Sequence, residues 1–199
     1  MKTFFIILTV IIAGIVVFQF VMFITIKKTE KQKYTVVRRD KGFEIRFYPS
    51  AILATIQSDA KTYKELSNPG FRKLAGYIFG GNEAGAKISM TSPVQMDIND
   101  SSSTMSFVMP AAYQTEKLPK PIDPGIVLKK TNDEYVAAIK FGGFASDRNL
   151  KFHSEKLQRL LKEKGITSQG NYRYLGYNPP FQFLGRRNEI IISVDWKGK

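Results

Sequence analysis

The N-terminal part of the chain most strongly limits what this sequence can fold into. From Thr3 to Ile26 it has 24 consecutive residues without a charged side chain, "TFFIILTVIIAGIVVFQFVMFITI". A helix of this length extends roughly 36 Å, which is enough to cross the hydrocarbon core of a bilayer. A secretory signal peptide is the alternative, but its apolar core is usually about 7 to 15 residues long, and no A-x-A-like cleavage site precedes the basic segment. The sequence therefore predicts an uncleaved, single-span membrane anchor.

Basic residues follow this apolar run closely. Four lysines lie between positions 27 and 33, whereas only Lys2 and the α-amine precede the run. Positive charge accumulates on the cytoplasmic side of a span, so residues 34–199 are predicted to lie in the cytoplasm. The lysines either flank the span, which is the simpler interpretation, or adhere to anionic headgroups. Residues 1–33 are thus assigned to an anchor and a basic linker, with the membrane as partner.

The rest of the chain, residues 34–199, is predicted to form one globular domain. It keeps 25 Lys and Arg (30 − 5) and 16 Asp and Glu (17 − 1), which is a net charge of +9. Basic residues are interspersed with acidic ones, as in "RRDKGFE", instead of forming the stripe typical of nucleic-acid-binding proteins, so we expect no nucleic-acid partner. Cysteine is absent, which excludes disulfides, thiolate catalysis and cysteine-ligated metals.

Strand and helix patterns follow each other in the first half of this domain. Residues 34–58 alternate in polarity and predict a β-hairpin with a turn at Asp40-Lys41-Gly42. Asn68-Pro69-Gly70 predicts a loop, after which apolar residues recur at helical spacing from Phe71 until Gly80-Gly81 ends the helix. The segments "KISM", "VQMDI" and "TMSFVMP" then predict three strands.

A similar order follows in the second half. Residues 114–125 carry three prolines and predict a connector; residues 126–141 predict a hairpin with a turn at Asn132-Asp133. An amphipathic helix, capped by Ser146 or Asp147 and ended by Gly165, and two further strands complete it. We therefore expect two pseudo-repeats, at about 34–114 and 125–199. The prolines of "MTSPV" and "YNPPF" are expected at equivalent turns or bulges, because proline cannot donate to a sheet.

Few residues have the chemistry of a catalytic or metal site. His153, the only histidine, shares helical spacing with Leu150 and Leu157, where packing is a commoner role than ligation; axial iron ligation is the alternative. "DINDSSS" lacks the spacing of a calcium loop, and the glycine-rich segments do not match phosphate loops. Arg186 and Arg187 either hold an anion or pair with acids in a turn. No nucleophile, acid/base pair or metal cluster is apparent, so we expect no enzyme.

Four segments, in this order, resemble the SOUL heme-binding protein family. They are "GFRKLAGYIFGGNEAGAKISMTSPV", "SFVMP", "FGGFASDRNLKFHSEKLQRLLKEKG" and "YNPPFQFLGRRNEI". The resemblance covers about residues 34–196, and "MTSPV" and "YNPP…GRRNE" are its most specific parts. It implies an α+β fold of duplicated hairpin-helix-strand-strand halves, which form a twisted antiparallel sheet or a distorted β-barrel with two helices. The N-terminal transmembrane helix is an addition to that pattern.

The resemblance also implies a ligand, heme or another tetrapyrrole, held reversibly in an apolar groove beside the first helix. The groove would be lined by one apolar helix face and faced by two phenylalanines of a loop, with three cations for the two propionates. On this sequence the helix face is Phe71, Leu74, Ala75 and Ile78, the loop residues are Phe181 and Phe183, and the cations are Arg72, Lys73 and Arg186.

The sequence departs from the family pattern at several positions. Gly76 stands where relatives often have a basic residue, and Gln182 where they have lysine. The axial histidine of some members has no counterpart in the first half, since His153 lies in the second helix. Met90 and Tyr77 are weak candidate ligands, and core packing is the role that the sequence favours for them. We therefore expect apolar contact and propionate pairing to dominate heme binding.

Three functions are compatible with these patterns. The leading hypothesis is a membrane-anchored protein for tetrapyrrole binding or trafficking, without catalysis. The second is an effector-binding or lipid-binding module of the same fold that holds a different flat apolar ligand. The third, an enzyme acting on tetrapyrroles, is disfavoured because no catalytic constellation is apparent.

Overall fold

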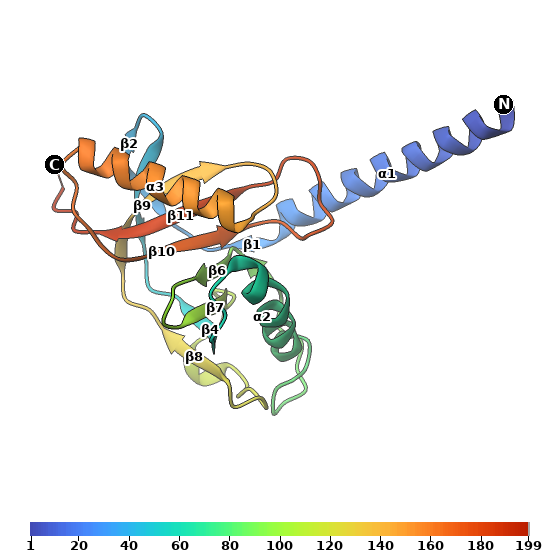
Figure 1. The fold of residues 1–199 in the computed structure, drawn as a ribbon. Coiled ribbons are helices and arrows are strands. Elements are labelled where there is room, and N and C mark those ends of the chain that lie inside the picture. The colour runs from blue at the N-terminus through green and yellow to red at the C-terminus, as the bar shows by residue number, and fades with distance from the viewer. Residues whose placement is uncertain (199) are drawn as a thin grey trace.

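The computed structural model describes residues 1–198, without the side chains of Ile26, Lys27 and Thr115, and its fold is α+β (Figure 1). The helices are α1 (Lys2–Lys28), α2 (Tyr63–Ile78) and α3 (Asp147–Glu163), with a 3-10 turn, η1, at Thr115–Lys117. The strands are β1 (Glu30–Lys31), β2 (Thr35–Asp40), β3 (Phe43–Tyr48), β4 (Ile52–Ser58), β5 (Thr91–Ser92), β6 (Val94–Asp97), β7 (Ser103–Val108), β8 (Ile126–Lys130), β9 (Glu134–Phe141), β10 (Ser168–Gly176) and β11 (Asn188–Val194).

Nine strands form one antiparallel sheet. Their order is β2-β3-β9-β11-β10-β6-β7-β4-β8, and β1 and β5 form a separate parallel pair. The edge strands β2 and β8 do not pair with each other, so the sheet is open, and of the two expected forms the closed barrel is not the one observed. α2 packs on β4 and β7, whereas α3 packs on β9, β10 and β11.

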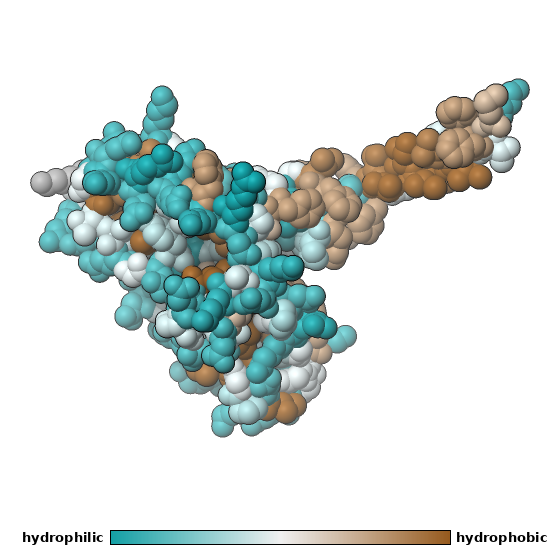
Figure 2. All heavy atoms as spheres, viewed as in Figure 1, coloured by the Kyte–Doolittle hydropathy of each residue, from teal (hydrophilic) through white to brown (hydrophobic). Residues whose placement is uncertain are grey.

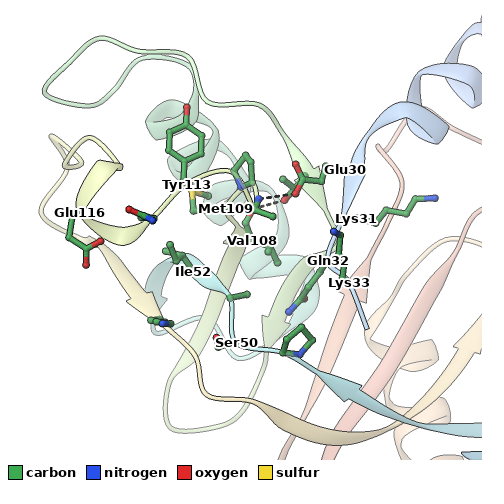
Figure 3. A pocket seen from close by; sticks show the side chains of 17 residues that line it. Glu30, Lys31, Gln32, Lys33, Ser50, Ile52, Val108, Met109, Tyr113 and Glu116 are labelled. Atoms are coloured by element: carbon green, nitrogen blue, oxygen red, sulfur yellow. Dashed lines mark hydrogen bonds between the residues drawn. The ribbon is translucent and has the colours of Figure 1, made fainter. Parts of the chain in front are cut away.

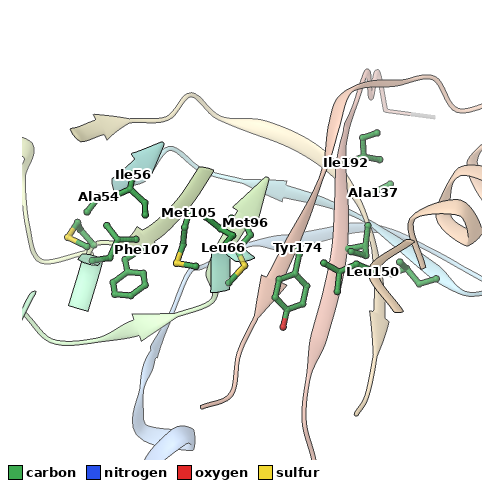
Figure 4. Packing of buried hydrophobic residues seen from close by; sticks show 14 of the residues in the cluster. Ala54, Ile56, Leu66, Met96, Met105, Phe107, Ala137, Leu150, Tyr174 and Ile192 are labelled. Carbon is green, nitrogen blue, oxygen red and sulfur yellow. The ribbon is translucent and has the colours of Figure 1, made fainter. Parts of the chain in front are cut away.

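The main hydrophobic core lies between the sheet and these two helices. Leu66 of α2 and Leu150 of α3 both point into it, together with strand residues such as Met105 and Ile192 (Figure 4). Neighbouring residues of a strand face opposite sides of a sheet, so a second set of side chains lies on the other face. That set forms a smaller buried cluster, which includes Leu175.

α1 projects from this domain, and its apolar side chains are exposed along most of its length (Figures 1 and 2). Its helical conformation agrees with the sequence prediction for Thr3 to Ile26. By length and composition, the segment Lys2–Thr25 is sufficient to cross a membrane. A signal sequence satisfies the same criterion.

The first predicted hairpin is confirmed, and the second is wrong. β2 pairs with β3 around Asp40-Lys41-Gly42, but β8 pairs with β4, while β9 lies between β3 and β11. The residues around the second turn bind a different segment: Ser50 N–H donates to Asp133 Oδ1 (2.6 Å), and Thr131 N–H donates to the Ala51 carbonyl (2.8 Å). The connection before β4 and the connection before β9 are therefore hydrogen-bonded to each other.

This pairing exchanges a strand between the two halves of the chain. The order strand-strand-helix-strand-strand occurs in β3-β4-α2-β6-β7 and again in β8-β9-α3-β10-β11. β3 joins β9 of the second half, and β8 joins β4 of the first half. Each half therefore supplies an outer strand to the other half of the sheet.

α2 begins eight residues before the predicted start, so the loop predicted at Asn68-Pro69-Gly70 is wrong. Leu66 is 1% exposed, and a Cβ atom at Gly70 would lie 3.0 Å from Met105 Cε, so the first turns pack tightly on the sheet. This packing outweighs the cost of an internal proline, which is about 3 kcal/mol. The start was readable in the sequence as a capping box, Thr62-x-x-Glu65. The prediction for α3 is confirmed: Ser146 Oγ accepts from Asn149 N–H at its start.

The two proline segments do not occupy equivalent positions, so that prediction is wrong. Pro93 follows a cis peptide bond and precedes β6, whereas Pro179 and Pro180 follow β10, the strand that corresponds to β6. Because Gly176 pairs with Val94, both segments lie at the same end of the β6–β10 pair. The expectation that Pro93 interrupts a strand is confirmed, since β5 ends before it and β6 begins after it.

Candidate ligand-binding site

The inner face of α2 carries two of the predicted groove residues. Thr62 caps the start of the helix, since its side-chain oxygen accepts from Glu65 N–H at 3.2 Å, and residues three and four apart then share a face. Leu74 and Ile78 are on the face that meets the sheet, and they are 0% and 1% exposed. Both belong to the hydrophobic core and offer no open surface to a ligand.

The outer face of α2 carries the other predicted helix residues. Phe71 is 39% exposed, and its ring lies 5.2 Å from that of Phe107. Arg72 is exposed, and Ala75 is half-buried. An exposed aromatic ring and an exposed arginine at neighbouring helix positions are the residue types that can contact a flat apolar ligand with acidic substituents.

Lys73 already has an acidic partner. Its Nζ lies 3.2 Å from Asp123 Oδ2, and both side chains are well exposed. Asp123 also accepts the Gly125 N–H at 2.8 Å. This backbone hydrogen bond and Lys73 hold the pKa of Asp123 below its usual value. Lys73 would therefore exchange one carboxylate for another if it bound a propionate.

The loop between β10 and β11, residues 177–187, carries Phe181 and Phe183, which are 47% and 59% exposed. The Phe181 ring lies 6.1 Å from Phe18 of α1, and the Phe183 ring lies 6.2 Å from Phe144. The Gln19 side chain also binds this loop. The two loop phenylalanines thus contact α1 and the segment that precedes α3.

Arg186 and Arg187 both have partners inside the chain. Arg186 Nη1 donates to the carbonyls of Pro179 (2.7 Å) and Gln182 (2.8 Å), and its guanidinium lies 4.5 Å from the Phe144 ring centroid. Arg187 pairs with Glu189 at 2.8 Å. Arg187 therefore pairs with an acid, as one of the two interpretations expected, whereas Arg186 binds loop carbonyls and has no acidic partner among the described residues.

His153 is held by aromatic packing. Its ring stacks on Phe141 at a centroid distance of 4.0 Å and meets the edge of Phe152 at 5.0 Å. Burial, and secondly the charge of Lys156, lower the pKa of His153, so the neutral ring is favoured. Within residues 1–198, its Nδ1 is buried without a hydrogen-bond partner, and no group of three His, Asp or Glu side chains could hold a metal ion.

The two weak candidate ligands are also packed. Tyr77 is 1% exposed, and its hydroxyl donates to the Pro119 carbonyl at 3.0 Å. Met90 is partly buried against the main core. Both residues therefore have the packing role that the sequence favoured.

A buried polar cluster on the sheet face opposite the helices was missed from the sequence. We define the Glu189 cluster as Tyr34, Arg46, Tyr177, Arg187 and Glu189. The fully buried Glu189 accepts from Arg46 (2.7 and 3.2 Å), from Arg187 (2.8 and 3.0 Å) and from the Tyr177 hydroxyl (2.9 Å). Burial alone would raise the pKa of Glu189, but the two arginines outweigh it and lower the pKa. The available signal was the alternation of "FEIRFY", which places Glu44, Arg46 and Tyr48 together on the face opposite its apolar residues.

Aromatic rings enclose this cluster. The Arg46 guanidinium lies 4.3 Å from the Tyr34 ring centroid, and that of Arg187 lies 4.0 Å from Tyr177. Burial raises the pKa of the neighbouring Tyr48 to about 12. Since both Glu189 oxygens are already fully engaged, the cluster fixes β3 to β11 across β9 and has a structural role.

A cavity of about 600 Å3 lies where the linker after α1 meets the first half of the sheet (Figure 3). Ile52, Val108 and Met109 give it an apolar part, and Lys31 and Lys33 also line it. Its size is within the range of small-molecule sites, roughly 300 to 1,000 Å3. None of the predicted groove residues lines it.

The fold first identifies the class: an α+β domain in which two helices cover one face of an open antiparallel sheet. The same fold is found in the C-terminal domain of EcmrR, with a TM-score of 0.57 and 10% identity over 81% of this chain and 98% of that chain. A hydrolase from Listeria innocua has a TM-score of 0.53 and 7% identity over 79% of this chain and 94% of that chain. At such low identity, these similarities concern the fold alone.

The sequence then identifies the family. Residues 29–193 match the SOUL heme-binding protein family, and the chain belongs to it. Heme-binding protein 2 of Mus musculus is 30% identical over 159 residues, which cover 76% of this chain and 77% of that protein. Heme-binding protein 1 of Mus musculus is 28% identical over 163 residues, or 78% of this chain and 85% of that protein.

Proposed function

We propose that this chain binds heme or another tetrapyrrole reversibly and without catalysis, as a membrane-anchored binding or trafficking protein. The observation that carries the proposal is membership of the SOUL heme-binding protein family over most of the chain. Similar proteins of mouse and human that bear the name heme-binding protein support it.

The outer face of α2 is the proposed contact surface. Phe71 and Ala75 supply apolar area, and the exposed Arg72 and Lys73 supply cations from the next two helix positions, about 100° and 200° around the axis from Phe71. Phe181, Phe183 and Arg186 form the facing side in this proposal. Leu74 and Ile78 support the surface from within the core, because they are fully buried.

The described residues fit the periphery of a heme better than its iron. A bound heme supplies a flat apolar face and two carboxylates, which match exposed phenylalanine and exposed arginine or lysine. His153 is engaged with Phe141 and lies on the other helix. We therefore assign binding to apolar contact and propionate pairing, without histidine ligation.

A hemin titration of the full chain in lipid nanodiscs tests this proposal. Empty nanodiscs of the same lipid provide the control, because hemin partitions into bilayers. We expect a saturable change of the Soret band at micromolar hemin that the control lacks. A response equal to that of empty nanodiscs would refute heme binding.

α1 is the proposed anchor, with residues 34–199 on the cytoplasmic side. The chain has no cysteine, so single introduced cysteines report their own location. Treatment of intact cells with a membrane-impermeant maleimide should label Lys2→Cys and spare Ser101→Cys, which lies in the exposed β6–β7 turn. The opposite pattern would reverse the orientation, and equal labelling of both variants would argue against a span.

Binding of a different flat apolar ligand is the alternative, and the cavity beside Met109 is the observation that favours it. The exposed Ala111 lines this cavity, so Ala111→Trp would fill it without disturbing α2. Hemin binding that survives Ala111→Trp supports the α2 surface. Loss of hemin binding in this variant would place hemin in the cavity, whereas a different ligand requires that the unmodified chain show no saturable hemin response.

We also propose that residues 34–114 and 125–199 are pseudo-repeats that arose by duplication. The repeated order of elements and the exchange of β3 and β8 support this division. The connector at 114–125 would then join the two copies.

A further inference from the structure

The segment Pro179–Gly185, which we call the apolar loop, lies directly beside α1. Figure 1 shows the β10–β11 connection reaching this helix, and Figure 2 shows the apolar surface of the helix. Phe181, Phe183 and Leu184 of the loop are 47%, 59% and 73% exposed, and the adjacent Phe144 is 51% exposed. Four large apolar side chains are thus exposed next to a helix that is itself apolar.

Gln19 attaches the apolar loop to α1. Its Nε2 donates to the Phe181 carbonyl, and its Oε1 accepts from the Phe183 N–H, both at 3.1 Å. The hydroxyls of Thr9 and Thr25 bond to carbonyls of their own helix four residues earlier. Gln19 instead satisfies both ends of its amide on a loop more than 160 residues away. A carboxamide in an apolar helix needs such partners if lipid surrounds it.

Several backbone groups of the apolar loop have hydrogen-bond partners inside the chain. Arg186 Nη1 binds the carbonyls of Pro179 and Gln182, and Gln182 Nε2 donates to the Leu184 carbonyl at 2.7 Å. The Gln182 side chain is 3% exposed, although its loop neighbours point outward. Polar groups turned inward and phenylalanines turned outward are the pattern expected of a loop whose surroundings are lipid.

The length of α1 also indicates that lipid surrounds the apolar loop. If the apolar loop and Gln19 lay in water, the bilayer would contain only Thr3–Phe18, which is 16 residues or about 24 Å. The hydrocarbon core is about 30 Å thick and needs about 20 residues. With Gln19 inside, the span Thr3–Ile26 is long enough. Gln19 is seven residues before Ile26, or about 10 Å along the axis, so the loop would lie within the lipid boundary.

We propose that the apolar loop, together with Phe144, inserts into the bilayer beside α1 and holds the domain against the membrane in one orientation. The partner is the lipid bilayer itself. This inference rests on the proposed anchoring by α1. Insertion of the loop would also place Phe181 and Phe183 in the bilayer, through which a lipid-soluble ligand can reach the protein. These two residues form the facing side of the proposed heme surface.

Depth-dependent quenching by spin-labelled lipids tests this inference on the full chain in liposomes. An environment-sensitive fluorophore is attached to Phe183→Cys, to Ile12→Cys in α1, and to Phe152→Cys in α3, which is 53% exposed and serves as the matched control. We expect lipid quenching and blue-shifted emission at positions 183 and 12, and quenching by aqueous iodide at position 152.

The outcomes separate the loop from the anchor. A label at position 183 that behaves like position 152, while position 12 is quenched by lipid, would overturn loop insertion and leave the anchor intact. Aqueous behaviour at position 12 would overturn both. Adding Gln19→Leu to Phe183→Cys should shift the label toward aqueous quenching, whereas adding Thr9→Val should not. Equal quenching in the two variants would show that Gln19 does not hold the apolar loop in the bilayer.

Discussion

Arg46 of β3 and Glu189 of β11 form a two-pronged ion pair of 2.7 and 3.2 Å in which Glu189 has no solvent exposure. The two strands are not neighbours, because β9 lies between them. The pair therefore spans a whole strand, and Arg187 adds a second cation to the same carboxylate. A buried charge of this kind is costly unless it is fully paired.

Removal of the Glu189 charge should destabilise the domain strongly. Glu189→Gln removes the buried carboxylate that both Arg46 and Arg187 bind and leaves Arg46 only the partly exposed Glu44, so we expect a loss of roughly 3–5 kcal/mol in the free energy of unfolding. Urea unfolding of the full chain, followed by the fluorescence of Trp196, the single tryptophan, measures it. Glu134→Gln is the control, since its pair with Arg173 has a similar length of 2.7 Å but is partly exposed, and it should cost about 0–1 kcal/mol. Equal losses would contradict a special role for burial.

His153 should make the domain less stable in weak acid. Its pKa is lowered by folding from the ordinary value of 6.5, so the unfolded chain binds a proton more readily. The stabilisation is present above 6.5 and is lost as the pH falls through the folded pKa. His153→Leu should flatten the dependence of the urea midpoint on pH below 6.5. An unchanged slope would show that other groups cause it.

Alanine substitutions at two glycines near the end of α2 should have opposite effects on the free energy of unfolding. A Cβ at Gly81 would lie 2.7 Å from the Gly76 carbonyl oxygen, a backbone atom, so Gly81→Ala should cost about 1–3 kcal/mol. A Cβ at Gly76 would meet nothing within 4 Å, so Gly76→Ala should stabilise by about 0.5–1 kcal/mol through its helix propensity. The same urea titration measures both. A stabilising Gly81→Ala would contradict the rigid contact.

Phe71 should contribute more to hemin binding than a comparable residue on α3. Phe71→Asp places a charge on the proposed contact surface and should weaken hemin binding at least tenfold, which is about 1.4 kcal/mol. Phe152→Asp introduces the same charge at an exposed phenylalanine of α3 and should leave the affinity unchanged. The nanodisc titration measures both affinities. Equal weakening in the two variants would remove α2 from the site.

Local signals predicted several elements correctly, although the strand predicted at "KISM" is wrong, since residues 87–90 form only an isolated bridge from Lys87 to Phe79. The α1 helix, the β2–β3 hairpin, the α3 cap at Ser146 and the break at Pro93 were all readable, because each depends on a few adjacent residues. The non-pairing of β8 and β9 was not readable, since Asp133 finds its partner at Ser50, more than eighty residues away. The packing of α2 on the sheet likewise allows the helix to continue through Pro69, which the sequence alone did not predict.

The same limit applies to the candidate site. Helical spacing groups Phe71, Leu74 and Ile78 together, but only the sheet decides that Leu74 and Ile78 face inward. The attachment of the apolar loop to Gln19 joins two segments at opposite ends of the chain, and no sequence motif indicates this contact. The Glu189 cluster is of the same kind, because its members come from residues 34 to 189.

The exchange of β3 and β8 also determines when the sheet can close during synthesis. Glu44 of β3 pairs with Ala138 of β9, which leaves the ribosome 94 residues later (138 − 44). The β2–β3 hairpin therefore has no further strand partner until most of the chain has been made. In the proposed membrane-anchored form, α1 leaves the ribosome first, and β9 joins this hairpin to the rest of the sheet only when the anchor is already in place.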